Sequence, residues 1–189
     1  ASVTYNWNYN AATLTNEGFV PIGYTGIGTF VGTFEGNNYS ISNLYINRSL
    51  ANSIGLFGTI QGTKIQNLGL INVWIKGQVQ AGGLFGASNA AQASTISNCY
   101  VTGTINALGG ATWSGGLAGV ARATTITNSY SMANVAGTGS SIGGLVGNLD
   151  WSSVIQNSFA SGTVTALGYA GGLVGNITSG TVTNCYATG

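Results

Sequence analysis

The pentapeptide GGLFG at residues 82–86 recurs along the chain, and this repetition decides the fold. Its copies are GGLAG at 115–119 and GGLVG at 143–147 and 171–175, and a shortened GLFG stands at 55–58. Successive leucines of these boxes lie 28, 33, 28 and 28 residues apart; they are Leu56, Leu84, Leu117, Leu145 and Leu173. A period of this length predicts a chain of equivalent units that stack on one another.

A second box follows the leucine box in each unit. It consists of an apolar residue, any residue, Asn, a small or apolar residue and usually an aromatic. Its copies are ISNLY at 41–45, IQNLG at 65–69, ISNCY at 96–100, ITNSY at 126–130, IQNSF at 155–159 and VTNCY at 182–186. A third segment rich in β-branched residues closes the unit, and no segment shows the apolar period of a helix.

A unit of this size with three short strands cannot bury a core by itself, so successive units must share one. We therefore predict an all-β fold, a parallel β-solenoid of about six rungs, with roughly 28 residues and three short strands per rung. An antiparallel sandwich is the alternative for regularly spaced strands, but it would need hairpin turns rather than a repeated three-strand unit. The longer spacing after Leu84 predicts outward loops at 88–94 and 107–114, with Trp113 and Trp151 at or near corners.

The boxes assign roles to their residues. Each leucine should point into the coil, between glycines that permit a positive φ or a close backbone approach. Side chains along a strand alternate between inward and outward. In the second box this alternation shifts by one residue at the Asn, which indicates a bend, a left-handed conformation or a ladder of side-chain amides. Ligand binding is the alternative role for this ladder, which comprises Asn43, Asn67, Asn98, Asn128, Asn157 and Asn184.

The residue after each of these asparagines should be buried, and the next should point outward as one of a row of aromatics. This predicted aromatic contact stripe consists of Tyr45, Tyr100, Tyr130, Phe159 and Tyr186. Stacked rings could stiffen the coil, pack against a neighbouring rod or form a platform for sugars. Cys99 and Cys185 share the buried position three rungs apart, about 14 Å along the rod. That exceeds the roughly 7 Å that a disulfide allows, so we predict free thiols, with an intermolecular bond at Cys185 as the alternative.

Composition excludes much chemistry. Seven of the 189 residues are charged, three of them carboxylates, and histidine is absent. Catalytic triads, histidine-rich metal sites and sugar-cleaving carboxylate clusters need more ionisable groups, so we predict no enzyme, no cofactor and no metal site. There is no basic cluster for nucleic acid and no apolar run of about 20 residues for membrane insertion. Glycosylation sequons at Asn38, Asn47 and Asn176 are near chance in an Asn-rich chain.

The two boxes together closely resemble the GLUG-motif repeat, and the stretch at 19–46 resembles the segment that leads into such repeats. This family occurs in bacterial surface and secreted proteins, including adhesins of the filamentous-haemagglutinin type and non-catalytic regions of IgA-specific metalloendopeptidases. The resemblance implies a right-handed β-solenoid on the bacterial cell surface or outside the cell, without catalytic residues.

We expect one solenoid domain at 19–189, preceded by a polar, aromatic segment at 1–18 that acts as a cap or docking arm. The main hypothesis is an extracellular structural protein whose partners are other copies of itself, joined end to end, because the final rung has no charged or looped cap and charges are scarce. The alternatives are a stalk or binding segment of a larger adhesin that contacts glycans or a host surface, and an ice- or glycan-binding solenoid. For the last, the Thr-x-Thr pairs at 125–127, 163–165 and 181–183 are expected to lie in different segments of the repeat.

Overall fold

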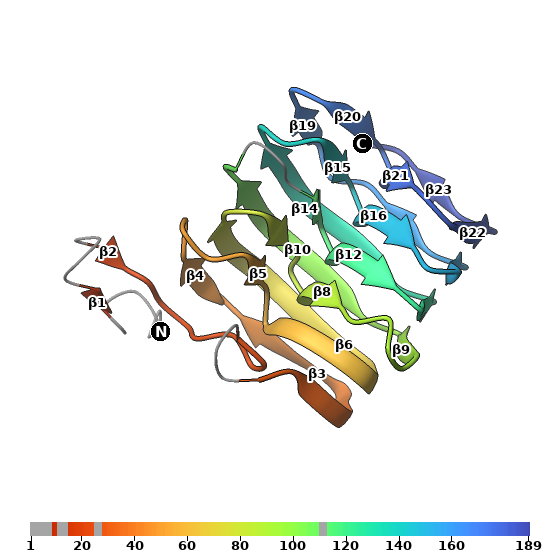
Figure 1. Cartoon of the computed structure of the whole chain (residues 1–189), viewed down its shortest axis with the longest axis horizontal. Helices are drawn as coiled ribbons and strands as arrows, with labels where there is room; N and C mark the ends of the chain where they lie inside the picture. The colour runs from red at the N-terminus through yellow and green to blue at the C-terminus, as the bar shows by residue number, and fades with distance from the viewer. Residues whose placement is uncertain (1–8, 11–14, 25–27, 110–112) are drawn as a thin grey trace.

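The chain winds into a parallel β-solenoid, seen here in a computed structural model that describes residues 9–10, 15–24, 28–109 and 113–189. Within these residues every regular element is a strand, and the strands of successive turns lie side by side (Figure 1). Hydrogen bonds between turns join residues about one repeat apart, as where the Ser129 N–H donates to the Ser158 side chain, 29 residues further on. The predicted fold class is therefore confirmed.

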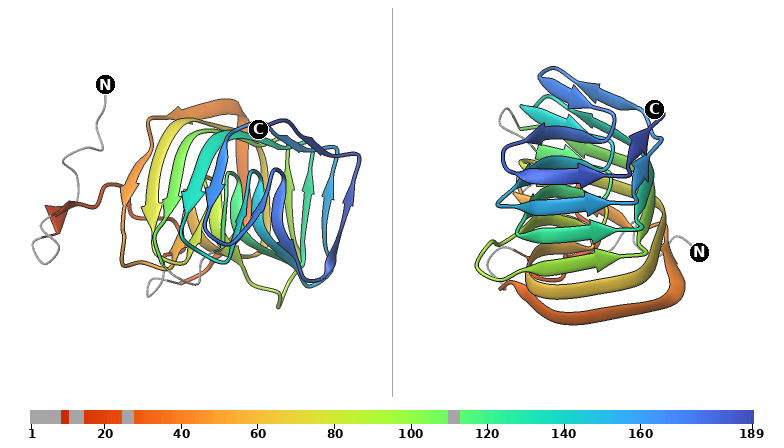
Figure 2. Two further views of the ribbon diagram at one scale, coloured as in Figure 1. Left: turned by 90° about the horizontal axis from the view of Figure 1, so that it is seen from above. Right: turned by 90° about the vertical axis from the view of Figure 1, so that its right-hand side faces the viewer.

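Each turn contributes strands to the same walls of the coil (Figure 2). The wall that follows the leucine boxes contains the start of β6 (Phe57–Gly77), β8 (Phe85–Ser88), β12 (Ala118–Arg122), β16 (Val146–Asp150) and β21 (Val174–Ile177). The second contains β3 (Phe30–Ser42), the middle of β6, β9 (Ser94–Ser97), β13 (Thr124–Thr127), β17 (Ser153–Gln156) and β22 (Gly180–Thr183). The third contains β4 (Tyr45–Asn47), the end of β6, β10 (Tyr100–Ala107), β14 (Tyr130–Gly137), β18 (Phe159–Ala160), β19 (Val164–Ala166) and β23 (Tyr186–Ala187).

A separate five-stranded sheet closes each turn just before the next leucine box. Its strands are β5 (Ser53–Ile54), β7 (Gln80–Ala81), β11 (Trp113–Gly115), β15 (Ser141–Gly143) and β20 (Tyr169–Gly171). Since each comes from a successive turn, the described chain makes about five turns and begins a sixth with β21, β22 and β23. The short closing strand is an element that the three-strand prediction did not contain.

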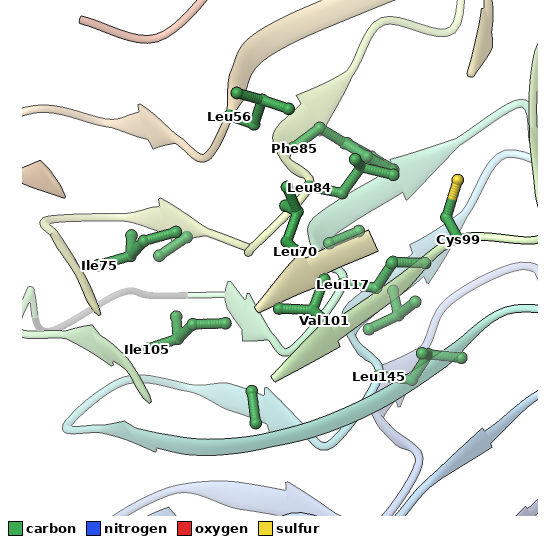
Figure 3. Packing of buried hydrophobic residues seen from close by; sticks show 14 of the residues in the cluster. Leu56, Leu70, Ile75, Leu84, Phe85, Cys99, Val101, Ile105, Leu117 and Leu145 are labelled. Atoms are coloured by element: carbon green, nitrogen blue, oxygen red, sulfur yellow. The ribbon is translucent and has the colours of Figure 1, made fainter. Parts of the chain in front are cut away.

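The leucines of the boxes form a row along the axis, buried in the first four boxes and partly buried at Leu173 in the last. The N–H of Leu84 donates to the carbonyl of Leu117, and that of Leu117 donates to Leu145, at 2.9 Å in both cases. Figure 3 shows these leucines beside Leu70 and Val101 from the third wall. Every one of these side chains has less than 1% of its surface exposed. Burial of apolar groups inside the coil thus holds successive turns together.

The box glycines are needed for close approach and not for a positive φ, because none of them has one. The last glycine of each box faces the strand that precedes the previous copy of the box. A Cβ on Gly119 would lie 2.5 Å from the Gly86 carbonyl oxygen and 2.8 Å from the Ala81 nitrogen. The middle glycine meets the carbonyl of the next turn's middle glycine, as Gly144 meets Gly172. Where a Cβ would meet backbone in this way, a side chain would force neighbouring turns apart.

The described part of the N-terminal segment meets the first turn. The strands β1 (Tyr9–Asn10) and β2 (Thr15–Asn16) pair antiparallel, to one side of the coil (Figure 1). Arg48 is buried, donates to the Glu17 carboxylate at 2.5 Å and to the Phe19 carbonyl at 3.2 Å, and lies over the Tyr24 ring. Residues 17–19 are therefore fixed on the solenoid, and the docking role of 1–18 stays a prediction.

Candidate functional site

Asparagines form a row at the corner between the second and third walls. All six predicted positions have φ between 48° and 60°, the left-handed region that Asn tolerates better than most residues. The Asn98 side-chain nitrogen donates to the Asn67 side-chain oxygen at 2.9 Å, and Asn184 donates to Asn157 at 3.3 Å. The strand alternation slips at this corner because the left-handed residue turns the chain. The placement supports a structural role, and a ligand-binding role for the row stays a prediction.

The row ends on a carboxylate that the sequence interpretation missed. The Asn67 side-chain nitrogen donates to Glu35 at 3.0 Å, and the Gln66 side-chain nitrogen also donates to this carboxylate. The Asn37 N–H donates to it at 2.7 Å. These hydrogen bonds, that of Asn67 first, lower the pKa of Glu35. The strand pairing places Glu35 beside Gln66, and the repeat pattern of the sequence contains no signal for this contact.

Asn43 and Tyr45 belong to a different corner from the one predicted. The prediction aligned ISNLY at 41–45 with IQNLG at 65–69, whereas the strand pairing sets Tyr45 beside Trp74. Asn72, which also has a positive φ, donates to the Asn43 side chain at 2.7 Å. The segment LINVW at 70–74 also fits the second box, so this turn has two asparagine corners. ISNLY pairs with the corner at 70–74 because an irregularity in β3, between Glu35 and Tyr39, shifts the register of β3 against β6.

Four of the five predicted aromatics form a continuous stack on the third wall. Neighbouring ring centroids are 5.1 Å apart for Tyr100 and Tyr130, 4.7 Å for Tyr130 and Phe159, and 5.0 Å for Phe159 and Tyr186. Their planes differ by 6° or less. Burial among these rings raises the pKa of Tyr130. Tyr45 is outside this stack and forms a separate stacked pair with Trp74, with centroids 4.9 Å apart.

Gly69 stands in the second turn at the position where the later turns have an aromatic. It pairs with Tyr100, and a Cβ on Gly69 would come within 2.7 Å of the Tyr100 ring. The stack of four rings therefore rests on a bare glycine at that end. The two inner rings, Tyr130 and Phe159, each have a ring on both sides, which stiffens this wall. Whether the stripe also contacts another molecule stays a prediction.

The residues between the asparagines and the aromatics point inward, as predicted. The first two are Leu44 and Leu68, and the later ones form a row of hydroxyls and thiols: the Cys99 N–H donates to Ser129 Oγ at 3.1 Å, and Ser129 Oγ donates to the Thr127 carbonyl at 2.8 Å. Cys99 and Cys185 are free thiols, the first buried and the second partly exposed. Burial raises the pKa of Cys99 to about 11.

The threonine pairs are distributed differently from the prediction. Thr125 and Thr181 both pair with Val154, and Thr127 and Thr183 both pair with Gln156, so two of the three pairs share the second wall and one register. The pair at 163–165 lies on the third wall, in and beside β19. The prediction that all three pairs lie in different segments was therefore wrong. The row on the second wall is still interrupted, because Val154 and Gln156 replace threonine in the turn between.

The remaining predicted sites have plain surroundings. Asn38 and Asn176 are exposed and Asn47 is half-buried, and the Asn176 side chain donates to Asn148 at 2.9 Å. Trp151 stands at an exposed corner, whereas Trp113 lies in β11, and the loop at 88–94 is largely exposed, as predicted. Of the loop predicted at 107–114, residues 110–112 lie outside the described residues. Among the described residues there is no cluster of three His, Cys, Asp or Glu side chains, and no helix that could cross a membrane.

Stacked parallel turns with a leucine row inside and asparagines at the corner define a repeat protein of the β-solenoid class. The model of the GLUG motif matches residues 138–165 and 166–189. The chain therefore contains GLUG-motif repeats at 138–189, and the resemblance of its boxes to this repeat is confirmed.

Two known proteins are similar to this chain over most of its length. Halomucin from Haloquadratum walsbyi is 42% identical over 162 residues, which are 84% of this chain and 2% of halomucin. The crystal structure of a candidate immunoglobulin A1 protease from Bacteroides ovatus superposes with a TM-score of 0.65 at 22% identity, and the match covers 89% of this chain and 63% of that one. At this identity the second likeness shows the fold alone.

Proposed function

We propose that the chain is a non-enzymatic structural protein of the cell exterior whose solenoids associate end to end in a filament or surface assembly. The GLUG repeats and the likeness to halomucin support an extracellular or surface repeat protein. The protease name of the structural neighbour carries no activity to this chain, because that likeness concerns the fold alone.

The use of the carboxylates supports a non-enzymatic role. Glu17 is paired with Arg48, Glu35 accepts from the asparagine row, and Asp150 accepts the Trp151 N–H at 2.9 Å. Each carboxylate thus has a structural contact, and Asp150 lies several turns from the other two. Glycoside hydrolysis generally uses two such groups on either side of one glycosidic bond.

The observation that favours association is the scarcity of charge on the coil. From residue 85 onward the chain contains two charged residues, Arg122 and Asp150, which face each other in neighbouring strands. The stacked aromatics, the threonine row and the exposed side chains of Met132 and Leu167 give neutral faces. A surface with so few like charges does not keep copies apart.

Electron microscopy of the purified chain, with sedimentation velocity over a range of concentrations, tests this proposal. We expect strings one solenoid wide whose lengths are multiples of one solenoid height, about 25–30 Å for five to six rungs. Single rods at every concentration would refute self-association. Bundles several solenoids wide would refute the end-to-end mode and place the contact on the side walls.

A second candidate is a repeat segment in the stalk or binding region of a larger adhesin. It is favoured by the comparison with halomucin, of which this chain spans only 2%. It predicts that the intact mass of the native polypeptide is far above the 19.0 kDa of this chain. Mass spectrometry of the polypeptide from its source decides between the two candidates.

A further inference from the structure

Trp151 occupies a corner that holds its indole out in solvent. It lies between β16 and β17, it is 62% exposed, and its φ is 50°, followed by 55° at Ser152. A large side chain adopts this left-handed region rarely, and such outliers concentrate at functional sites. The corner is firmly built: Asp150 Oδ1 accepts the Trp151 N–H, Ser153 Oγ donates to the Asp150 carbonyl at 2.6 Å, and the Ala123 N–H donates to the Trp151 carbonyl at 3.2 Å.

A groove of about 540 Å³ runs beside this indole. Its lining comes from several turns: Thr59 and Ala87 from the first wall, residues 88–91 from the outward loop, Arg122 at the end of β12, and Trp151. Since neighbouring rungs are about 4.8 Å apart, the loop and the indole, two turns apart, are separated by roughly 10 Å along the axis. Arg122 comes from the turn between them, so the loop, the guanidinium and the indole follow one another along the groove.

Arg122 supplies the groove with a positive charge. Its backbone is fully used, because its N–H donates to Ser88 Oγ at 2.7 Å and its carbonyl accepts from Thr124. Its guanidinium has no hydrogen bond or ion pair with any residue of the described chain, although Asp150 lies next to it in the neighbouring strand. The lining contains no carboxylate, so the five guanidinium donors are available to a ligand anion.

The other polar lining residues are amides and hydroxyls held in place. Gln80 Oε1 accepts from Ser53 Oγ at 2.7 Å, and Asn89 Oδ1 accepts the Ala91 N–H at 3.1 Å. These bonds fix the two oxygens and leave each amide nitrogen as a donor for a ligand. An exposed aromatic ring, one cation and fixed amides suit a ligand with an apolar face, several hydroxyls and an acidic group.

We propose that this groove binds an acidic saccharide. The C–H face of one sugar ring lies on the Trp151 indole, its carboxylate or sulfate takes a forked pair of hydrogen bonds from Arg122, and its hydroxyls meet Asn89 and Gln80. A peptide fits less well. A single acidic sugar would use both features of the groove, because its ring would stack on the indole while its anionic group bound the guanidinium. The site is separate from the aromatic stripe on the third wall and does not depend on self-association.

Isothermal titration calorimetry of the full chain tests this proposal with three defined probes: an oligogalacturonate for the carboxylate, a heparin oligosaccharide for the sulfate, and cellotetraose as the neutral control. We expect at least one acidic probe to bind, and cellotetraose to bind at least about tenfold more weakly. The tighter acidic probe identifies the anionic group. The absence of binding by both acidic probes at millimolar concentration would overturn the proposal, as would equal binding of cellotetraose.

Variants locate the site. Trp151→Gly keeps the positive φ without the ring, and Arg122→Gln removes the charge; each should weaken binding at least about tenfold. Matched controls are Trp74→Ala, a partly exposed tryptophan on the third wall, and Lys64→Gln, an exposed cation on the second. Both controls should bind as the parent does. Equal losses in the controls, or unchanged binding by both Trp151→Gly and Arg122→Gln with the same thermal unfolding as the parent, would overturn the assignment.

Discussion

The middle glycine of the leucine box offers the sharpest test of how the turns fit together. Gly144 and Gly172 occupy the same position in successive boxes, and neither has a positive φ. A Cβ on Gly144 would lie well inside 3.0 Å of the Gly172 carbonyl oxygen and 2.8 Å from the Ala160 Cβ. A Cβ on Gly172 would lie 2.9 Å from the Ala187 Cβ, and the next nearest atom, the Gly189 carbonyl oxygen, is 4.0 Å away.

Gly144→Ala should therefore destabilise the chain more than Gly172→Ala does. Inserting an atom against fixed backbone costs about 1–3 kcal/mol, whereas a lower unfolded-state entropy returns about 0.4–1 kcal/mol to any such variant. Because both variants share the second effect, the difference between them measures the steric cost, which we expect to be about 2 kcal/mol. For a chain of this length that corresponds to a difference of about 4–8 °C in the melting temperature.

Urea unfolding at 25 °C and thermal unfolding, both followed by circular dichroism, provide the measurement. The parent and both variants are compared at one protein concentration, so that association contributes equally. Equal losses in the two variants would refute the argument that contact between turns requires glycine. So would a Gly144→Ala variant as stable as the parent.

Three further predictions concern the corners and the thiols. Asn98→Ala should lower the free energy of unfolding by about 2 kcal/mol, because alanine is strained in the left-handed region and the hydrogen bond to Asn67 is lost. Asn98→Gly should lower it by less. Urea unfolding of both variants checks this, and equal losses would contradict it. Since hydrogen bonds lower the pKa of Glu35 in the folded chain, its stabilising contribution is present above the usual value of 4.5 and is lost as the pH falls through the folded pKa. Glu35→Gln should lack this acid-sensitive part, so unfolding profiles from pH 7 to pH 3 that are parallel for parent and variant would contradict the assignment. Iodoacetamide at pH 8 should modify the partly exposed Cys185 first and Cys99 only on unfolding, since burial raises the pKa of Cys99 to about 11. Mass spectrometry of the labelled peptides measures the two modification rates, and equal rates would contradict the prediction.

Repetition in the sequence was sufficient to predict most of the coil. The leucine row, the left-handed asparagines and the stack from Tyr100 to Tyr186 follow from residues that recur at one spacing. In a parallel solenoid, equal spacing in the chain means stacking in space, so a local pattern directly predicts a contact. The prediction failed in the first two turns, where ISNLY at 41–45 could align with either of two boxes.

The candidate sites could be predicted only in part. Tryptophan at a corner and an exposed loop at 88–94 were visible in the sequence, but their convergence with Arg122 on one groove was not. These residues come from three different turns, and their distance depends on how far each insertion projects from the coil. The same limitation applies to Glu35, whose hydrogen bonds to Asn67 and Gln66 depend on the irregular pairing of β3.

The sequence by itself determined the period, the inward leucines and the bends, because these depend on a residue's own conformational preference and on a spacing that the coil converts into contact. Only the tertiary structure decided the register of the first turns, the common wall of two threonine pairs and the reason for the box glycines. Each of these features depends on how one turn packs against the next. That packing is determined by the hydrogen bonds between neighbouring strands and by how closely two backbones can approach. The glycines that open the recurring pentapeptide could have served a left-handed turn or a close approach, and the packing of one turn on the next selects close approach.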